Sequence, residues 1–198
     1  MSQELDYSAT LTGASFLFYE FKQVVSLAEQ GFTEAEIKEK VLTDNLFQYK
    51  VKSSLKRSLP SVLRRVSVLD ATLRKWVLAD SLDSGKIINL YAIMKTDRLF
   101  FEFMNEVIRE KLEAGNFLLE KKDLNQYFAS KAEQDAGVAS WTDQTVNKLK
   151  QVFVKILLES GILKNKKTGE LTRLLMDERL KRNLVNIGDI AYVKAMGE

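Results

Sequence analysis

The feature that most constrains this chain is an amphipathic segment that starts near Thr142 and stops at Gly161. Its apolar residues recur at the spacing of an α-helix and form one stripe, which is typical of a helix packed on a core: Val146, Leu149, Phe153, Ile156 and Leu157. The opposite face carries amide and ammonium side chains, the groups that reach bases and phosphates: Gln144, Lys148, Gln151 and Lys155. The pattern predicts a long helix with one buried face and one cationic face.

A short basic hairpin is predicted directly after this helix, within residues 162–174. Two short segments flank a turn that contains lysines and Gly169, as in the wing of a winged helix. The helix and hairpin together indicate nucleic-acid binding, although an amphipathic cationic helix can also be a solvated surface helix. In the first reading Thr145 joins the four polar helix residues in the groove, and the hairpin contacts phosphates through Lys164, Lys166, Lys167 and Arg173.

Composition favours a mostly helical fold. The 198 residues include one proline and nine glycines, which leaves little material for loops, and 45% hydrophobic residues are enough for a packed core. We expect a mainly α fold of two packed helix-turn-helix-like modules, the C-terminal one winged-helix-like with a small β-hairpin. The best candidate boundary lies at residues 80–85, so the expected modules are residues 1–80 and 81–198.

Cysteine and histidine are both absent from the chain. Their absence excludes a Cys–His dyad, a Ser–His–Asp triad and an ordinary structural zinc site. The carboxylates are spread over helix starts and surface positions, which gives a two-metal nuclease little support. We therefore expect a non-enzymatic protein with no catalytic residues, no bound metal and no cofactor.

The positive charge is concentrated in two islands, although the net charge is only +3. Residues 46–75 carry eight basic side chains and one acidic one, and residues 144–167 carry six lysines and one glutamate. Such islands are typical of local nucleic-acid contacts. From the first island we expect a second backbone contact through Lys52, Lys56, Arg57 and Arg64. The alternative is that these residues pair with the acidic residues of the N-terminal 45 residues.

The first half of the chain reads as helices over 13–30, 34–43, 51–69 and 71–79. Gly31 would end the first helix, and Thr33 with Glu36 has the capping-box pattern that would open the second. Pro60 complicates the third, since a proline inside a helix removes a backbone hydrogen bond. Either the helix kinks there, or Ser58 caps a new helix that has Pro60 in its first turn.

The second half reads as helices over 86–95, 97–114 and 123–134, followed by the amphipathic helix, the hairpin and a helical tail over 177–195 with a break at Gly188. Lys95, Asp97 and Arg98 lie inside an aromatic-rich stretch. They could form an active site, but we favour a half-buried ion-pair network that joins the two halves. The phenylalanines that follow them could stack on bases, but their helical spacing favours the core.

The chain is expected to be cytoplasmic. Residues 1–4 are polar and acidic, unlike a signal peptide, and no segment approaches the roughly 20 apolar residues of a membrane helix. We therefore expect no membrane association.

Residues 89–104, which include Lys95-Thr96-Asp97-Arg98, resemble the BrxA family of bacterial BREX phage-defence systems. Further matching blocks lie over residues 7–9, 11–14 and 45–50, and at Trp141 with residues 148–152, so the resemblance spans nearly the whole chain. It implies a cytoplasmic, all-helical protein that binds double-stranded DNA and serves phage defence beside a methyltransferase, an ATPase and a phosphatase-like protein. It supplies no catalytic motif. Pro60 departs from the usual basic helix of the family.

Two alternatives stay open at this point. The family is also similar in fold to NusB-type antitermination proteins, which bind RNA, so an RNA-binding role is one of them. The other is a protein–protein assembly module of the defence complex, with the aromatic-rich N-terminal region as an interface. For the main reading we expect duplex DNA binding with weak sequence preference, because few side chains are clearly suited to reading bases.

Overall fold

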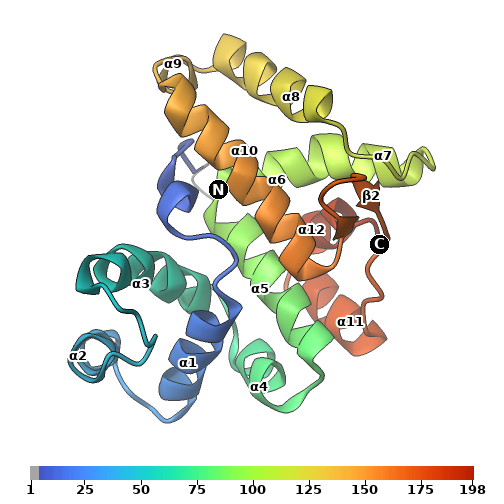
Figure 1. The fold of residues 1–198 in the computed structure, drawn as a ribbon. Helices are drawn as coiled ribbons and strands as arrows, with labels where there is room; N and C mark the ends of the chain where they lie inside the picture. Colours follow the sequence, from blue (N-terminus) through green and yellow to red (C-terminus); the bar gives the residue numbers. More distant parts are fainter. Residues whose placement is uncertain (1–4) are drawn as a thin grey trace.

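The computed structural model describes residues 5–198, and this part of the chain is mostly helical (Figure 1). The elements in chain order are η1 (Thr10–Gly13), α1 (Phe18–Glu29), α2 (Glu34–Asp44), α3 (Lys52–Ser67), α4 (Ala71–Ala79), α5 (Leu82–Thr96), α6 (Arg98–Phe103), the π-helical turn η2 (Met104–Ile108), α7 (Arg109–Glu113), α8 (Lys121–Gln134), α9 (Ala136–Ala139), α10 (Asp143–Ser160), β1 (Leu163–Asn165), β2 (Glu170–Leu171), α11 (Glu178–Asn186) and α12 (Ile190–Ala195). The predicted fold class, mainly α with a small hairpin, is confirmed.

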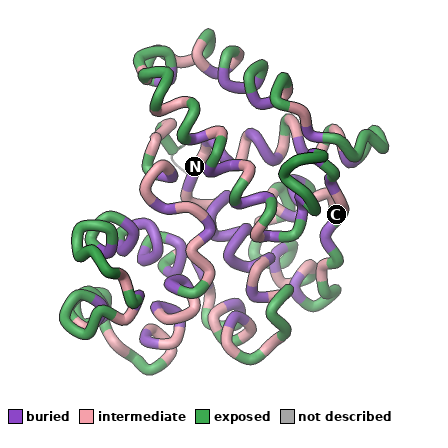
Figure 2. The backbone as a smooth tube through the Cα atoms, viewed as in Figure 1, coloured by how far each residue is buried: buried purple, intermediate pink, exposed green. Residues whose placement is uncertain are grey.

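Helix α5 runs through the middle of the molecule (Figure 1). Residues 87–94 are all buried, because apolar side chains surround the helix instead of forming a stripe. The one polar residue among them, Asn89, donates to the carbonyl of Phe16. Helices α1, α3 and α4 contact α5 on one side, and α6, α10 and α12 contact it on the other. One buried core therefore continues through both halves of the chain (Figure 2). The predicted module boundary falls where Ser81 caps the start of α5; a division into residues 1–80 and 81–198 stays a prediction.

Helix α3 continues through Pro60 as one helix, so the alternative of a new helix capped by Ser58 is wrong. The Ser58 hydroxyl donates to the carbonyl of Leu55, one turn earlier in the same helix. Pro60 lies on the exposed side, where water can hydrate the carbonyl that its missing N–H leaves without a helical partner.

The first predicted helix begins later than its apolar pattern indicates. Helix α1 starts at Phe18, since Leu17 has a left-handed backbone with φ 49°. The buried guanidinium of Arg65 donates to the carbonyls of the three residues just before Leu17, at 2.7 to 2.8 Å. These carbonyls accept from a side chain distant in sequence instead of from a local helix, so residues 14–17 stay irregular. The predicted ends of α1 at Gly31 and of α11 at Gly188 are confirmed.

The predicted amphipathic helix and the basic hairpin after it are both present. Thr142 caps α10 through its hydroxyl, and Gly161 ends the helix with φ 92°. Strands β1 and β2 then pair antiparallel. Residues 117–119 lie along β2 and exchange backbone hydrogen bonds with its start, which ties the hairpin to the segment before α8. Gly169 is required in this corner, because a Cβ atom there would stand 2.2 Å from the carbonyl oxygen of Leu119.

The expectation about a signal peptide concerns residues 1–4, which lie outside the described residues. In residues 5–198, no helix combines the length and the apolar character that crossing a bilayer requires.

Candidate nucleic-acid interface

The two faces of α10 are arranged as its sequence pattern predicts. Leu149, Phe153 and Ile156 are fully buried. The polar stripe is exposed: Gln144, Lys148, Gln151 and Lys155. Thr145 is half-buried, and its hydroxyl lies 3.0 Å from that of Thr142 at the helix start. Helix α10 thus presents amides and ammonium groups to solvent along its length.

Helix α3 exposes the predicted residues of the first basic island: Lys52, Lys56, Arg57 and Arg64. Arg64 donates to the hydroxyl of Ser61 at 3.2 Å. Arg65, the neighbour of Arg64, points the opposite way and is only 1% exposed. This island therefore divides into an exposed cationic face and one buried arginine that holds the loop before α1.

Two adjoining grooves lie between α3 and α10, with volumes of about 530 and 860 Å3. Both are lined by Thr12, Arg57 and Lys148. The larger groove adds polar residues of α10: Gln144, Thr145, Asn147 and Gln151. The smaller one adds Gly13 of η1, together with the loop before α3 and the first turns of α3: Gln48, Tyr49, Lys50, Val51, Ser54 and Ser58. The structure thus brings one residue of each basic island, Arg57 and Lys148, to the same place.

The short turn η1 joins the two sides of these grooves, since it contacts both α3 and α10. The hydroxyl of Thr12 donates to the carbonyl of Ala9 at 2.7 Å, which stabilises the turn. Gly13 lies directly under the Arg57 side chain, because a Cβ atom on Gly13 would stand 2.7 Å from Cδ of Arg57 and 2.9 Å from its Cγ. A glycine at this position therefore lets the stem of Arg57 lie across η1.

The hairpin residues lie apart from the grooves, which in the described part of the chain are lined by none of them. Lys166 and Lys167 are exposed in the turn between the strands. Lys164 pairs with Glu170 across the hairpin at 2.9 Å. Arg173 donates to the carbonyls of Leu112 and Gly197 at 2.6 and 2.9 Å, so its guanidinium holds the C-terminal segment against α7. All four predicted hairpin residues are exposed, but in the described part of the chain the side chains of Lys166 and Lys167 form no ion pair or hydrogen bond.

Nine of the fourteen groove residues were not among the predicted site residues, and three of the nine show why. Asn147 shares the polar stripe of α10, since it lies three residues after Gln144 and four before Gln151, so helical periodicity could have identified it. Lys50 was counted in the first basic island but not chosen. Thr12 belongs to an uncharged N-terminal segment, and only the packing of η1 against both helices brings it here.

The charged residues around position 97 make structural contacts, as predicted, but the ion pairs of Lys95 and Arg98 with Asp189 and Glu102 lie within residues 81–198 and do not join the two halves. Lys95 pairs with Asp189 at the start of α12, and Arg98 pairs with Glu102. One oxygen of Asp97 accepts from the backbone N–H of Phe100 and caps α6. Phe100 and Phe103 are fully buried, and their rings pack against other aromatic rings of the core. They are therefore not available to stack on bases.

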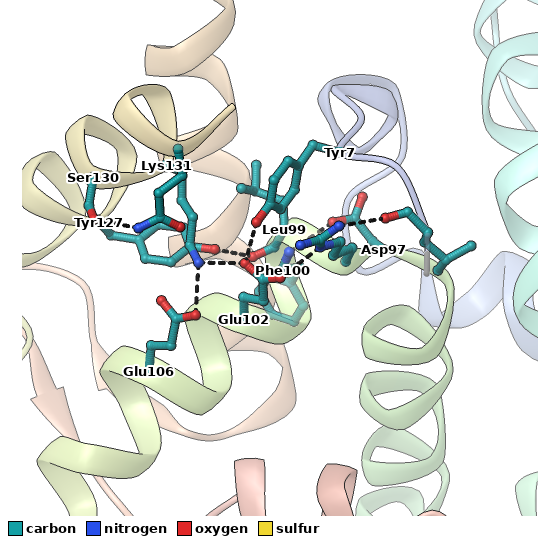
Figure 3. Close-up of polar contacts among 12 residues, drawn as sticks. Tyr7, Asp97, Leu99, Phe100, Glu102, Glu106, Tyr127, Ser130 and Lys131 are labelled. Carbon is teal, nitrogen blue, oxygen red and sulfur yellow. Dashed lines mark hydrogen bonds and ion pairs between the residues drawn. The ribbon is translucent and has the colours of Figure 1, made fainter. Parts of the chain in front are cut away.

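A second buried network holds the segment before η1 (Figure 3). Nζ of Lys131, on α8, pairs with the carboxylates of Glu102 and Glu106. The hydroxyl of Tyr7 donates to Glu102 at 2.7 Å, and Arg98 donates to the other carboxylate oxygen. Burial alone would raise the pKa of Glu102, but the hydrogen bonds from Lys131 and from the two other donors outweigh it and lower the pKa. The network anchors residues 5–9 and thereby the approach to the grooves.

Within residues 5–198, the acidic side chains form no group of three or more that could hold a metal ion.

Comparison with known proteins places the chain in a family. The sequence model of the BrxA family matches residues 5–188. The BREX protein BrxA of Bacillus cereus is 42% identical over 198 residues, which cover all of this chain and 95% of that protein. The BREX protein BrxA of Paramagnetospirillum magneticum is 25% identical over 83% of each chain. A crystal structure of an uncharacterized protein from Magnetospirillum magneticum has the same fold, with a TM-score of 0.82, 23% identity, and coverage of 96% of this chain and 97% of that one. The chain belongs to the BrxA family.

Proposed function

We propose that this protein is a non-enzymatic, cytoplasmic component of a BREX phage-defence system that binds double-stranded DNA with weak sequence preference. The BREX assignment follows from its family and from the names of its relatives. The observation that supports DNA binding is the convergence of Arg57 and Lys148 in one pair of grooves between α3 and α10. Cations and amides along a groove are the side chains that bind a phosphate backbone.

The amides of α10 support a modest contribution from the bases. Gln144, Asn147 and Gln151 line the larger groove, and amide side chains are suited to adenine. The lysines around them bind phosphates of any sequence. Charge therefore supplies most of the affinity in this proposal, and the two exposed lysines of the hairpin turn would add contacts beside the grooves.

The test is fluorescence anisotropy with a labelled duplex of 30 base pairs, titrated at several salt concentrations. Lys148→Glu combined with Arg57→Glu should abolish binding. Lys121→Glu combined with Lys122→Glu makes the same change in charge at the start of α8, outside the grooves, and should leave most of the affinity. Competition with RNA and with single-stranded DNA of matched sequence shows which nucleic acid the protein prefers. No binding at low salt would sink the proposal, and stronger competition by RNA would favour the antitermination-like alternative.

A role as an assembly module is the second candidate, and one observation favours it. Leu82 and Leu175 are 59% and 93% exposed, and a hollow of about 220 Å3 beside them is lined by Asp83, Ile87 and Leu175, among others. Exposed leucines around a hollow are typical of a protein contact. The partners would be the methyltransferase, ATPase or phosphatase-like protein of the system. Leu175→Asp should weaken co-purification with one of them and leave DNA binding unchanged, whereas unchanged co-purification would argue against this surface.

A further inference from the structure

We propose that Arg57 and Lys148 form a clamp that holds a single backbone phosphodiester between α3 and α10, at the point where the two grooves meet. This inference rests on the proposed DNA binding and deepens it, because it names the group that is bound and the two residues that bind it. The first support is geometric. The two cations come from different helices, yet both line both grooves, together with Thr12.

The second support is the absence of a counter-charge. Two basic side chains near the grooves and the hairpin already have a carboxylate partner, Lys155 with Glu159 and Lys164 with Glu170. Neither Arg57 nor Lys148 forms an ion pair with any carboxylate of residues 5–198. Two like charges that face the same groove repel each other, and an anion between them would remove that repulsion.

The third support is preorganisation. The stem of Arg57 lies across Gly13, which restricts where the guanidinium can go before any ligand arrives. A side chain that is already restricted loses less conformational entropy when it binds. Lys148 projects from the exposed face of a helix whose opposite face is packed in the core. The stem of Arg57 therefore packs on η1 on one side of the groove, and the backbone that carries Lys148 belongs to a packed helix on the other.

The fourth support is chemical. A phosphodiester carries one negative charge on two non-bridging oxygens. The planar fork of a guanidinium suits this geometry, and an ammonium group can bind the same anion as a point charge. The hydroxyl of Thr12 donates to Ala9, so it is a wall of the site and not a donor to the ligand. The grooves on either side leave room for the adjoining sugars and bases of the strand.

A double-mutant cycle tests the clamp. Arg57→Gln, Lys148→Gln and the double variant are compared with the natural protein by duplex binding across salt. Each neutralised phosphate adds about 0.9 to the slope of log K against log salt. One shared phosphate predicts that the double variant loses about 0.9 of slope, and that its loss of affinity differs at least about threefold from the product of the single losses. The matched pair Arg57→Gln with Lys155→Gln should give losses that multiply, because Lys155 lies outside both grooves.

The outcomes separate the clamp from the general function. A slope loss of about 1.8 with multiplying losses would mean two separate phosphates; the clamp would be wrong and DNA binding would stand. If the double variant keeps the salt slope of the natural protein, neither cation contacts DNA, and the clamp would again be wrong. If the natural protein binds no DNA, the clamp is judged by NMR of the Arg57 Nε–H signal during titration with inorganic phosphate. A saturable shift that Lys148→Gln removes would support the clamp, and no shift would overturn it.

Discussion

The stem of Arg57 lies so close to Gly13 that any side chain at position 13 would displace it. A Cβ atom added at position 13 would stand only 2.7 Å from Cδ of Arg57. Arg57 is exposed and reaches the grooves from α3, while Gly13 ends the turn that contacts both α3 and α10. The position of the Arg57 side chain thus depends on residue 13, more than 40 positions earlier in the sequence, having no side chain.

Gly13→Ala should weaken duplex binding without removing any charge. The new methyl group displaces the guanidinium, and losing one charge-assisted hydrogen bond costs about tenfold in affinity. The free energy of unfolding should change by less than about 0.5 kcal/mol, because the displaced stem lies at the surface. Anisotropy and urea denaturation measure the two quantities. In an Arg57→Ala background the same glycine substitution should have no further effect on binding, and a full additional loss would show that Gly13 acts by another route.

We expect Arg173 to contribute to stability, and Lys166 and Lys167 to contribute to DNA binding. Arg173→Gln loses two hydrogen bonds to the carbonyls of Leu112 and Gly197, so we expect the free energy of unfolding to fall by about 2 kcal/mol. Lys166→Gln with Lys167→Gln should change stability by less than about 0.5 kcal/mol and lower the salt slope of DNA binding. Thermal unfolding and salt titration of both variants check this. The reverse result, with stability lost only in the lysine variant, would contradict the assignment.

Features that depend on neighbouring residues were predictable from the sequence. The capping box of Thr33 and Glu36 and the glycine stop at Gly161 involve only residues a few positions apart, and both are present. The polar stripe of α10 follows in the same way from helical spacing.

Features that depend on packing between distant segments were not predictable. Arg65 reads as one more member of a basic island, yet it is buried because its partners are carbonyls about 50 positions earlier. The predicted extension of the first helix back to residue 13 is wrong for the same reason. The meeting of Arg57 with Lys148 depends on η1 lying between α3 and α10, and periodicity within one helix carries no information about that arrangement.

Asp97 should make the free energy of unfolding depend on pH between its ordinary pKa of 3.8 and its folded pKa of about 6. Burial raises its pKa to about 6, although the hydrogen bond from Phe100 and the positive charges of Arg65 and Arg64 act in the opposite direction. Because the folded protein binds this proton more tightly than the unfolded chain does, the contribution of Asp97 to stability falls as pH rises toward and through about 6. Urea denaturation from pH 5.0 to 7.5 should show this slope in the natural protein. Asp97→Asn should reduce the slope of the free energy of unfolding against pH. An unchanged slope would mean that another group titrates.

Lys131→Met should be the most destabilising of these substitutions. Only 4% of the Lys131 side chain is exposed, and its ammonium neutralises the carboxylates of Glu102 and Glu106. Removing one member of a buried ion pair leaves an uncompensated charge and costs about 3 kcal/mol. The loss is measured as the difference in the free energy of unfolding at pH 7. Lys122→Met is the matched control: that side chain is 72% exposed and pairs with Glu120, so its loss should leave the free energy of unfolding nearly unchanged.

The pH dependence of the stability difference between the natural protein and Lys131→Met shows whether the charge of Lys131 causes it. The pKa of Glu102 is lowered in the folded protein, so the stability that this carboxylate contributes is present above its ordinary pKa of 4.5 and is lost as pH falls through the folded value. Protonated Glu102 no longer requires the ammonium group. The gap between the natural protein and Lys131→Met should therefore narrow as pH falls below about 4.5. A gap that stays constant to lower pH would mean that Lys131 stabilises the fold by packing, through its contact with the Tyr127 ring, and not by its charge.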